Sequence, residues 1–177
     1  METLDADLVR QTVSGSHQAF DVLMVRYQKL IYQVAYSFYG NTEDAMDVCQ
    51  DVFLQAHQKM AMLEQPSKVK AWLVRMTYNR CISLKRSAQE LWSPLNDDEF
   101  VSQDNPQMEH QNKTLISRCL AVLNPKQKLA VVLKYLEGYS LKELSQTMDI
   151  SEDQVKNMLY RSIRKMAASV RESEEAL

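Results

Sequence analysis

Apolar residues recur along most of the chain at the three- and four-residue spacing of an amphipathic helix. The clearest run covers residues 18–39 and is followed by Gly40. Its apolar positions are Phe20, Leu23, Met24, Tyr27, Ile31, Val34 and Phe38. This spacing places them on one side of a helix, so the segment predicts a long helix with one buried face. We expect Gly40 to end it, because glycine readily adopts the left-handed backbone conformation.

The same pattern predicts seven further helices. They are expected at residues 5–13 (with Asp5 or Asp7 as N-cap), 42–60, 68–87, 114–122, 125–137, 140–148 and 151–170. Four residues are placed to cap helix N-termini, namely Asn41, Asn124, Ser140 and Ser151. Three glycines and four prolines in 177 residues are too few for the frequent turns of a strand-rich fold. The sequence therefore predicts an all-α protein.

The helical periodicity stops between residues 89 and 111. This stretch contains Pro94 and Pro106, and it has Asp and Glu residues but no Lys or Arg. Such a composition predicts a flexible acidic linker. We therefore expect two small helical domains, at residues 1–88 and 113–177, joined by a linker at residues 89–112. The second domain contains a helix-turn-helix pattern.

The net charge of −2 conceals strong segregation of charge along the chain. Residues 41–57 carry four acidic and no basic charges, whereas residues 68–86 carry six basic and no acidic charges. Residues 113–170 carry ten Lys or Arg against five Asp or Glu. Segregation of this kind indicates several distinct partner surfaces, and the basic blocks favour nucleic acid.

Several classes of protein are disfavoured by the sequence. The acidic N-terminus predicts no secretory leader, and apolar runs such as residues 129–133 are too short to span a bilayer. Three widely separated cysteines are typical of a reducing cytoplasm. Neither the cysteines nor the three histidines occur at metal-ligand spacing. We therefore expect a cytoplasmic protein with no metal ion, no cofactor and no membrane insertion of its own.

Residues 140–166 have the pattern of a short helix, a tight turn and a longer helix. On the longer helix, one side carries Val155, Leu159, Ser162, Ile163 and Met166. The opposite side carries Asp153, Asn157, Arg161 and Arg164, adjoined by Lys156 and Tyr160. A DNA-recognition helix needs one docked face and one face of hydrogen-bonding groups that enters the major groove. A solvated amphipathic helix is the alternative, but the turn position and the basic excess favour DNA.

The predicted helix at residues 68–87 has no acidic residue. Arg75, Asn79 and Arg86 share one face, and Trp72 lies close beside them. Cations beside an aromatic ring suit unpaired nucleic acid, because they hold phosphates while the ring stacks on a base. Core packing is the alternative role for Trp72, and the two roles are compatible.

The preceding helix carries three carboxylates on one face. Asp44, Asp47 and Asp51 are spaced three and four residues apart, and Gln50 and Phe53 adjoin them. A metal or acid–base site is disfavoured, since no basic or histidine partner falls at ligand spacing. A solvated face and an acidic docking surface for a basic protein partner both remain open.

Five segments resemble the extracytoplasmic-function sigma factors of the sigma-70 family. Residues 44–56 (DAMDVCQDVFLQA) and 71–79 (AWLVRMTYN) resemble the family's second conserved region, approximately D-A-x-D-x-x-Q-x-x-F-x-x-A and then W-L-x-x-I-x-x-N. Residues 123–128 (LNPKQK) and 135–144 (YLEGYSLKEL) resemble the start of its fourth region, and residues 155–161 (VKNMLYR) resemble its recognition helix. The resemblance covers nearly the whole chain except the linker.

This resemblance implies a subunit that brings RNA polymerase to promoters and has no enzymatic activity of its own. The implied partners are the clamp helices and flap of core polymerase, promoter DNA and an anti-sigma factor, in a stress or envelope response. Polymerase docking is implied for Asp44, Asp47, Gln50, Asp51, Phe53 and Leu54. Recognition and melting of the minus-ten element are implied for Lys68, Trp72, Arg75, Asn79, Lys85 and Arg86. Reading of the minus-thirty-five element is implied for Lys142, Ser151, Gln154, Lys156, Asn157, Tyr160, Arg161 and Arg164.

The chain departs from the family pattern at three places. Residues 60–69 lack the Phe-Arg-Gly that many members have there, Asp153 and Gln154 replace the usual Gly-Thr, and Ser145 replaces an alanine. The main alternative function is a free-standing helix-turn-helix regulator that binds duplex DNA as a dimer. Such a regulator needs neither an acidic docking helix nor a helix for single-stranded DNA. A nucleic-acid-modifying enzyme is disfavoured because no catalytic constellation appears.

Overall fold

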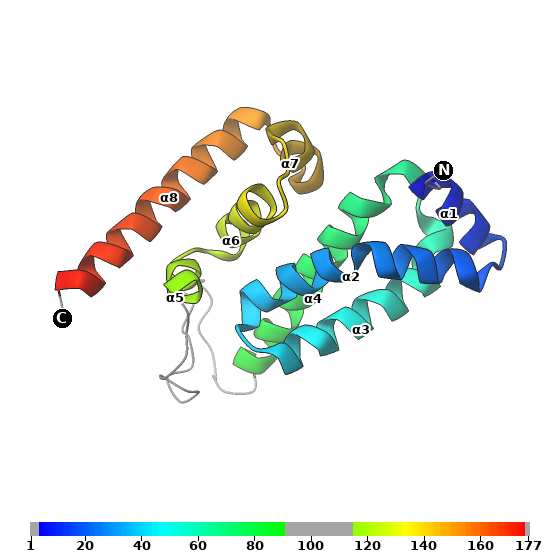
Figure 1. Cartoon of the computed structure of the whole chain (residues 1–177), viewed down its shortest axis with the longest axis horizontal. Coiled ribbons are helices and arrows are strands. Elements are labelled where there is room, and N and C mark those ends of the chain that lie inside the picture. Colours follow the sequence, from blue (N-terminus) through cyan, green and yellow to red (C-terminus); the bar gives the residue numbers. More distant parts are fainter. Residues whose placement is uncertain (1–3, 91–114, 176–177) are drawn as a thin grey trace. The chain divides into compact units, whose positions relative to one another are not determined.

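A computed structural model describes residues 4–90 and 115–175. The chain divides into two compact units, residues 1–84 and residues 85–177. Every regular element in the described ranges is a helix, which confirms the predicted all-α class (Figure 1). The predicted linker at residues 89–112 lies outside the described residues apart from its first two positions. No helix in the described ranges is long and apolar enough to span a membrane.

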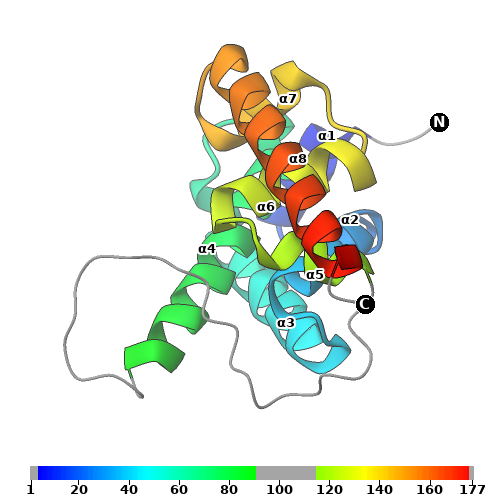
Figure 2. The ribbon, with the colours of Figure 1, turned by 90° about the vertical axis from the view of Figure 1, so that its left-hand side faces the viewer.

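The first unit is built from α1, α2, α3 and most of α4, with two short 3-10 turns before α4. Their bounds are Asp5–Val13 (α1), His17–Tyr39 (α2), Thr42–Lys59 (α3), Met60–Met62 (η1), Pro66–Lys68 (η2) and Val69–Glu90 (α4). Helices α2 and α3 lie side by side in both ribbon views (Figures 1 and 2). The core of this unit includes Ile31 of α2, Val52 of α3 and Leu73 of α4, each at most 2% exposed. Full burial of one such side chain contributes about 1.5–3 kcal/mol.

The turn between α2 and α3 follows the predicted signals. Gly40 has a left-handed φ of 72° and ends α2, and its N–H donates to the carbonyl of Tyr36 at 2.8 Å. The side chain of Asn41 then accepts from the N–H of Asp44 at 2.9 Å and caps α3. Both assignments are confirmed, and together they fix α3 against α2.

The predicted N-cap of α1 is wrong. Leu4 occupies that position and makes no side-chain cap. Asp5 instead accepts hydrogen bonds from the Arg26 guanidinium and the Tyr27 hydroxyl of α2, and Asp7 accepts from Arg10 at 2.6 Å. Charge-assisted bonds to a partly buried arginine are stronger than a cap in solvent, so the carboxylate of Asp5 joins α1 to α2 instead.

The second unit has four α-helices and one π-helical turn. Their bounds are Leu115–Ala121 (α5), Pro125–Val131 (α6), Val132–Leu136 (η3), Leu141–Met148 (α7) and Glu152–Glu175 (α8). The predicted caps are confirmed: Asn124, Ser140 and Ser151 each accept from the backbone N–H three residues later. The partners Gln127, Glu143 and Gln154 accept from the cap N–H in return. These reciprocal bonds define three capping boxes.

The helix predicted at residues 125–137 changes character halfway. It is α-helical only to Val131 and continues as the π-helical turn η3. The N–H of Glu137 reaches back five residues to the carbonyl of Val132 at 3.2 Å, and Gly138 then adopts a left-handed φ of 70°. Lys134 extends its ammonium to the Tyr139 carbonyl at 3.0 Å. The wider turn therefore leads directly into the cap of α7.

Helix α8 presents a narrower buried stripe than its sequence predicts. Val155, Leu159 and Ser162 are buried, and the Ser162 hydroxyl donates to the Met158 carbonyl at 2.7 Å. Ile163 was expected on this side but is 42% exposed. At 100° per residue it lies about 80° away from Val155, which places it at the edge of the stripe.

Candidate docking and nucleic-acid interfaces

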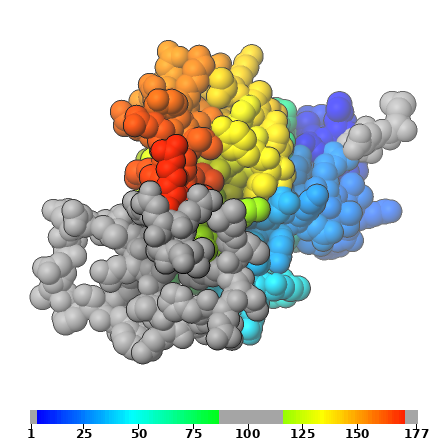
Figure 3. Space-filling model, turned by 60° about the vertical axis from the view of Figure 1, so that its left-hand side comes forward, coloured from blue at the N-terminus to red at the C-terminus, as the bar shows by residue number. Residues whose placement is uncertain are grey.

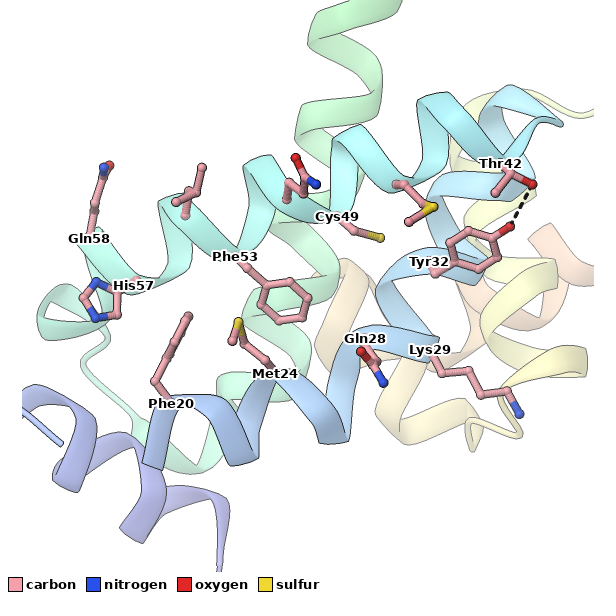
Figure 4. A pocket seen from close by; sticks show the side chains of 13 residues that line it. Phe20, Met24, Gln28, Lys29, Tyr32, Thr42, Cys49, Phe53, His57 and Gln58 are labelled. Atoms are coloured by element: carbon pink, nitrogen blue, oxygen red, sulfur yellow. Dashed lines mark hydrogen bonds between the residues drawn. The ribbon is translucent and has the colours of Figure 1, made fainter. Parts of the chain in front are cut away.

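An apolar groove of about 1100 Å³ lies between α2 and α3 (Figure 4). Phe20 and Met24 of α2 face Phe53 of α3 across it. The rings of Phe20 and Phe53 are arranged edge to face with their centroids 6.5 Å apart. The rings of Phe20 and His57 are also edge to face, with their centroids 4.8 Å apart. Three of the predicted docking residues line this groove, namely Gln50, Phe53 and Leu54.

The groove is open and its outer wall is apolar. On α3, Met46 is 53% exposed and Leu54 is 63% exposed. Exposed apolar side chains that adjoin a groove mark protein-binding surfaces, and methionine adapts to irregular partners. Burial raises the pKa of the Cys49 thiol in this groove to about 11, so at neutral pH it is an uncharged, apolar contact. Sequence reasoning missed Met46 and the α2 wall, because their partners are distant in sequence.

The three carboxylates of α3 do not line the apolar groove. Asp44 and Asp47 are both exposed, and Asp44 accepts a hydrogen bond from the Asn41 amide at 2.7 Å. Asp51 turns toward α4 and forms an ion pair with Arg80. The predicted acidic docking face is therefore divided: Asp47 is exposed to solvent, whereas Asp51 is paired with Arg80 of the next helix.

A second concavity, which we call the basic hollow, lies between α3 and α4 and has a volume of about 590 Å³. Its lining consists of Gln55 and Lys59 of α3 and Trp72, Arg75, Met76, Asn79, Arg80 and Ser83 of α4. The structure thus brings together three residues predicted for minus-ten recognition, and Trp72 is half-buried as it lines the hollow. The ring therefore packs on the unit and faces the hollow at the same time.

The other residues predicted for the minus-ten element lie outside the basic hollow. Lys68 is exposed in η2, and Arg86 is exposed near the C-terminal end of α4. Lys85 is half-buried one residue earlier. At 1.5 Å per residue, Arg86 is about 16 Å along the helix from Arg75, so these cations extend the basic face beyond the hollow.

Gln55, Lys59 and Arg80 were not singled out from the sequence. A signal for the first two was present: with Asp51 they repeat every four residues along α3, as neighbours on one helix face do. Within the described ranges, no carboxylate lies within ion-pair distance of Lys59 or Arg75. The hollow therefore presents positive charge that the unit itself does not neutralise.

Tyr39 ties α2 to α4 behind the basic hollow. Its hydroxyl donates to the Cys81 carbonyl at 3.1 Å. Burial raises the pKa of this hydroxyl, and the nearby charges of Cys81 and Asp44 add to the effect. The protonated hydroxyl donates this hydrogen bond, which joins α2 to α4.

The helix-turn-helix of the second unit presents its predicted reading face to solvent. All eight residues assigned to the minus-thirty-five element are exposed, namely Lys142, Ser151, Gln154, Lys156, Asn157, Tyr160, Arg161 and Arg164. In Figure 3 the side chains of α8 form the orange-to-red part of the surface. Arg164 lies over the Tyr160 ring at 5.8 Å, a cation–π contact that orients both side chains.

Asn157 and Arg161 are exposed four residues apart on one face of α8, and neither side chain has a hydrogen-bond partner within the described ranges. Ser151 and Gln154 differ, because a serine hydroxyl and an amide oxygen are occupied in the capping box. The hydroxyl hydrogen of Ser151 and the amide nitrogen of Gln154 remain as donors for a partner.

Two departures from the family pattern have structural explanations. Asp153 forms an ion pair with Lys156 at 3.2 Å and lies in the first turn of α8, where the helix dipole favours an acid. Ser145 donates its hydroxyl hydrogen bond to the Ile150 carbonyl at 2.6 Å. That bond closes the turn between α7 and α8, in which Asp149 has a left-handed φ of 55°.

Comparison with known proteins matches both units. The family described as Sigma-70 region 2 matches residues 23–90, and the family described as Sigma-70, region 4 matches residues 113–166. The chain is 30% identical over 167 residues to the ECF RNA polymerase sigma factor SigM of Mycobacterium tuberculosis, covering 94% of this chain and 84% of that relative.

Two solved structures share the fold. One is the structure of CnrH in complex with the cytosolic domain of CnrY, with a TM-score of 0.73 and 24% identity over 96% of this chain and 98% of that one. The other is RpoE of Bartonella quintana in complex with the anti-sigma factor NepR. Its TM-score is 0.65, with 21% identity over 86% of this chain and 96% of that one.

Proposed function

Because the chain belongs to the extracytoplasmic-function class of the sigma-70 family, we propose that it directs bacterial RNA polymerase to a specific set of promoters. Its domains are residues 1–88 for polymerase docking and the minus-ten element, and residues 113–177 for the minus-thirty-five element. Residues 89–112 connect them. The observation that carries the proposal is the double use of α3, which borders an apolar groove with α2 and a basic hollow with α4.

The apolar groove is the docking surface for core polymerase. Its exposed apolar side chains, together with the exposed carboxylate of Asp47 on the same helix, suit an amphipathic helix that carries basic residues. The clamp helices of the polymerase's largest subunit have this role for the family. Phe53 and Leu54 are the central anchors, because apolar groups buried at the centre of an interface dominate its energy.

The basic hollow receives the unpaired strand of the minus-ten element. Lys59 and Arg75 attract phosphates, and Trp72 offers a ring on which a base can stack. Asn79 adds an amide that can hydrogen-bond to a base edge. A free-standing regulator of duplex DNA has no use for such a concave, aromatic surface, so the combination favours the sigma-factor function.

The second unit reads duplex DNA upstream. Asn157 and Arg161 are the residue types that pair bidentately with adenine and guanine in the major groove. Lys142, Lys156 and Arg164 surround them with cations that fix the helix on the phosphate backbone. The same domain contacts the polymerase flap, as the family resemblance implies.

We place the protein in the cytoplasm, where its polymerase and promoters are, and assign it no catalytic activity. We further propose control by an anti-sigma factor in a stress or envelope response, supported by the likeness to RpoE, which was solved with the anti-sigma factor NepR. Such a partner would release the protein when the signal arrives.

The test is assembly of the purified full chain with sigma-free core polymerase, measured by size-exclusion chromatography and by fluorescence titration. We expect co-elution. Leu54→Asp is expected to weaken core binding at least tenfold, which corresponds to about 1.4 kcal/mol. Val25→Asp is the matched control, because Val25 is 69% exposed on α2 and does not line the groove.

Failure of the wild-type chain to co-elute, together with salt-sensitive binding of the chain alone to duplex DNA, would instead support the free-standing regulator. Equal losses in Leu54→Asp and Val25→Asp would remove the groove from the docking role.

A further inference from the structure

The ion pair between Asp51 and Arg80 joins the two helices that form the basic hollow. Both Nε and Nη2 of Arg80 donate to Oδ2 of Asp51, at 2.9 and 2.5 Å. The two side chains are 30% and 38% exposed, so the pair is at the surface of the unit. Arg80 lines the hollow, whereas Asp51 lines neither the hollow nor the apolar groove.

Stability alone does not account well for this pair. Ion pairs with about a third of each side chain in solvent contribute little to folding, because water screens them and ordering two side chains has an entropic cost. Their geometry is nevertheless specific: both bonds run to one carboxylate oxygen. The pair therefore does more to fix the direction of the guanidinium than to hold the helices together.

The three cations of the hollow differ in their freedom. Lys59 and Arg75 are exposed and have no carboxylate partner within the described ranges, so no ion pair there fixes their side chains. Arg80 is held by Asp51 on one edge of its guanidinium. An arginine has five N–H donors, so those on its other edge remain available to an anion. A group fixed before binding loses less entropy when the ligand arrives.

We propose that Asp51 is a positioning residue of the promoter face, and that it aims Arg80 at a phosphate of the unpaired promoter strand in the basic hollow. This inference rests on the proposed function and changes one of its assignments. Asp51 moves from the polymerase-docking residues to the promoter-binding residues. Gln55 and Lys59, one and two turns further along α3, continue the same strip into the hollow.

The test compares Asp51→Asn, which keeps the size and removes the charge, with Asp21→Asn, an exposed neutralisation on α2 that lines neither surface. Each full-length variant is assembled with core polymerase. The probe is a promoter fragment that wild-type holoenzyme selects from a randomised library, used both as duplex and as its nontemplate single strand. Readouts are core affinity, single-strand affinity against salt, and permanganate reactivity of unpaired thymines.

We expect Asp51→Asn to bind core polymerase within about twofold of wild type and the single strand about three- to tenfold more weakly, with less thymine reactivity. Arg80→Ala should make the negative slope of log affinity against log salt shallower by about 0.7, which is the change expected when one single-strand phosphate contact is lost. The double variant should lose little more than either single variant, because the two residues act as one unit. Asp21→Asn should match wild type.

The variant Arg80→Lys guards against a folding defect in Asp51→Asn, since it keeps the charge and loses the two-bonded fork. It should reproduce the single-strand defect. Reduced core affinity with intact strand binding in Asp51→Asn would return Asp51 to the docking surface and overturn the inference. Tighter strand binding would also overturn it, because Asp51 would then only neutralise Arg80. A wild-type chain that does not bind core polymerase would refute the proposed function itself.

Discussion

The two units present nucleic-acid surfaces of opposite shape. In the first unit, cations and a half-buried tryptophan surround a concavity between α3 and α4. In the second, exposed side chains project from the convex face of the single helix α8. A concave surface with an aromatic wall can enclose an unstacked base, whereas a convex helix fits the major groove of an intact duplex. The difference supports our proposal that one unit opens the strands and the other reads the duplex.

The largest effect is expected from removal of the arginine that we propose reads the duplex from α8. Arg161→Ala should weaken binding to the upstream duplex element by about ten- to a hundredfold, or about 1–3 kcal/mol, through loss of a bidentate base contact. Opening of the downstream element, once bound, should be unchanged. Competition binding with duplex fragments measures the first and permanganate footprinting the second.

Arg171→Ala is the control for Arg161→Ala, since Arg171 is exposed on the same helix about 15 Å further along. An identical transcript profile for Arg161→Ala and Arg171→Ala would remove the reading role from the N-terminal part of α8.

Removal of the Trp72 ring from the basic hollow tests the proposed binding of the unpaired strand. Trp72→Ala should weaken holoenzyme binding to the unpaired strand by about tenfold, through loss of one base-stacking surface. Binding to the upstream duplex should be unaffected. Trp72→Phe retains a ring and should retain most of the affinity. If both variants lose only thermal stability and bind the strand normally, Trp72 is a core residue alone.

A smaller effect is expected at the turn that orients α8. Ser145→Ala removes the 2.6 Å hydrogen bond to the Ile150 carbonyl and should lower the free energy of unfolding of the second unit by about 1 kcal/mol. Denaturation followed by circular dichroism measures it. Ser37→Ala in α2, which removes a local serine-to-carbonyl bond in the first unit, tests whether the loss is confined to one unit. An unchanged unfolding midpoint in Ser145→Ala would show that the family alanine serves the turn equally well.

The last effect expected is confined to alkaline pH and concerns the stability of the first unit. Burial raises the pKa of Cys49 from 9.0 to about 11, so the folded state holds the thiol proton more tightly than the unfolded state. The corresponding stability is complete below about pH 9 and is lost as pH rises to about 11. Cys49→Ala should flatten the unfolding free energy across this window relative to wild type. Parallel curves for the two proteins would contradict the assignment.

Local signals in the sequence predicted most of the fold. Asn41, Asn124, Ser140 and Ser151 cap their helices because a cap depends on neighbours within three residues. Gly40 ends α2 for an equally local reason. The same local logic failed at Asp5, whose carboxylate has a stronger partner 21 residues away in Arg26.

The candidate surfaces were predicted only in part, for a related reason. Trp72, Arg75 and Asn79 share a helix face and were found together, but Gln55 and Lys59 join them from another helix. Helical spacing placed Asp47 and Asp51 on one face, yet it could not show that Asp51 reaches Arg80. The position of α4 against α3 separates the apolar groove on one side of α3 from the basic hollow on the other.

We propose that the two sides of α3 bind different partners. Photo-crosslinking from two adjacent positions on α3 tests this directly. Leu54 lines the apolar groove and Gln55 lines the basic hollow. With benzoylphenylalanine in the open promoter complex, we expect position 54 to crosslink to the polymerase's largest subunit and position 55 to promoter DNA. Crosslinking of both positions to the same partner would contradict the proposal that α3 binds polymerase on one side and promoter DNA on the other.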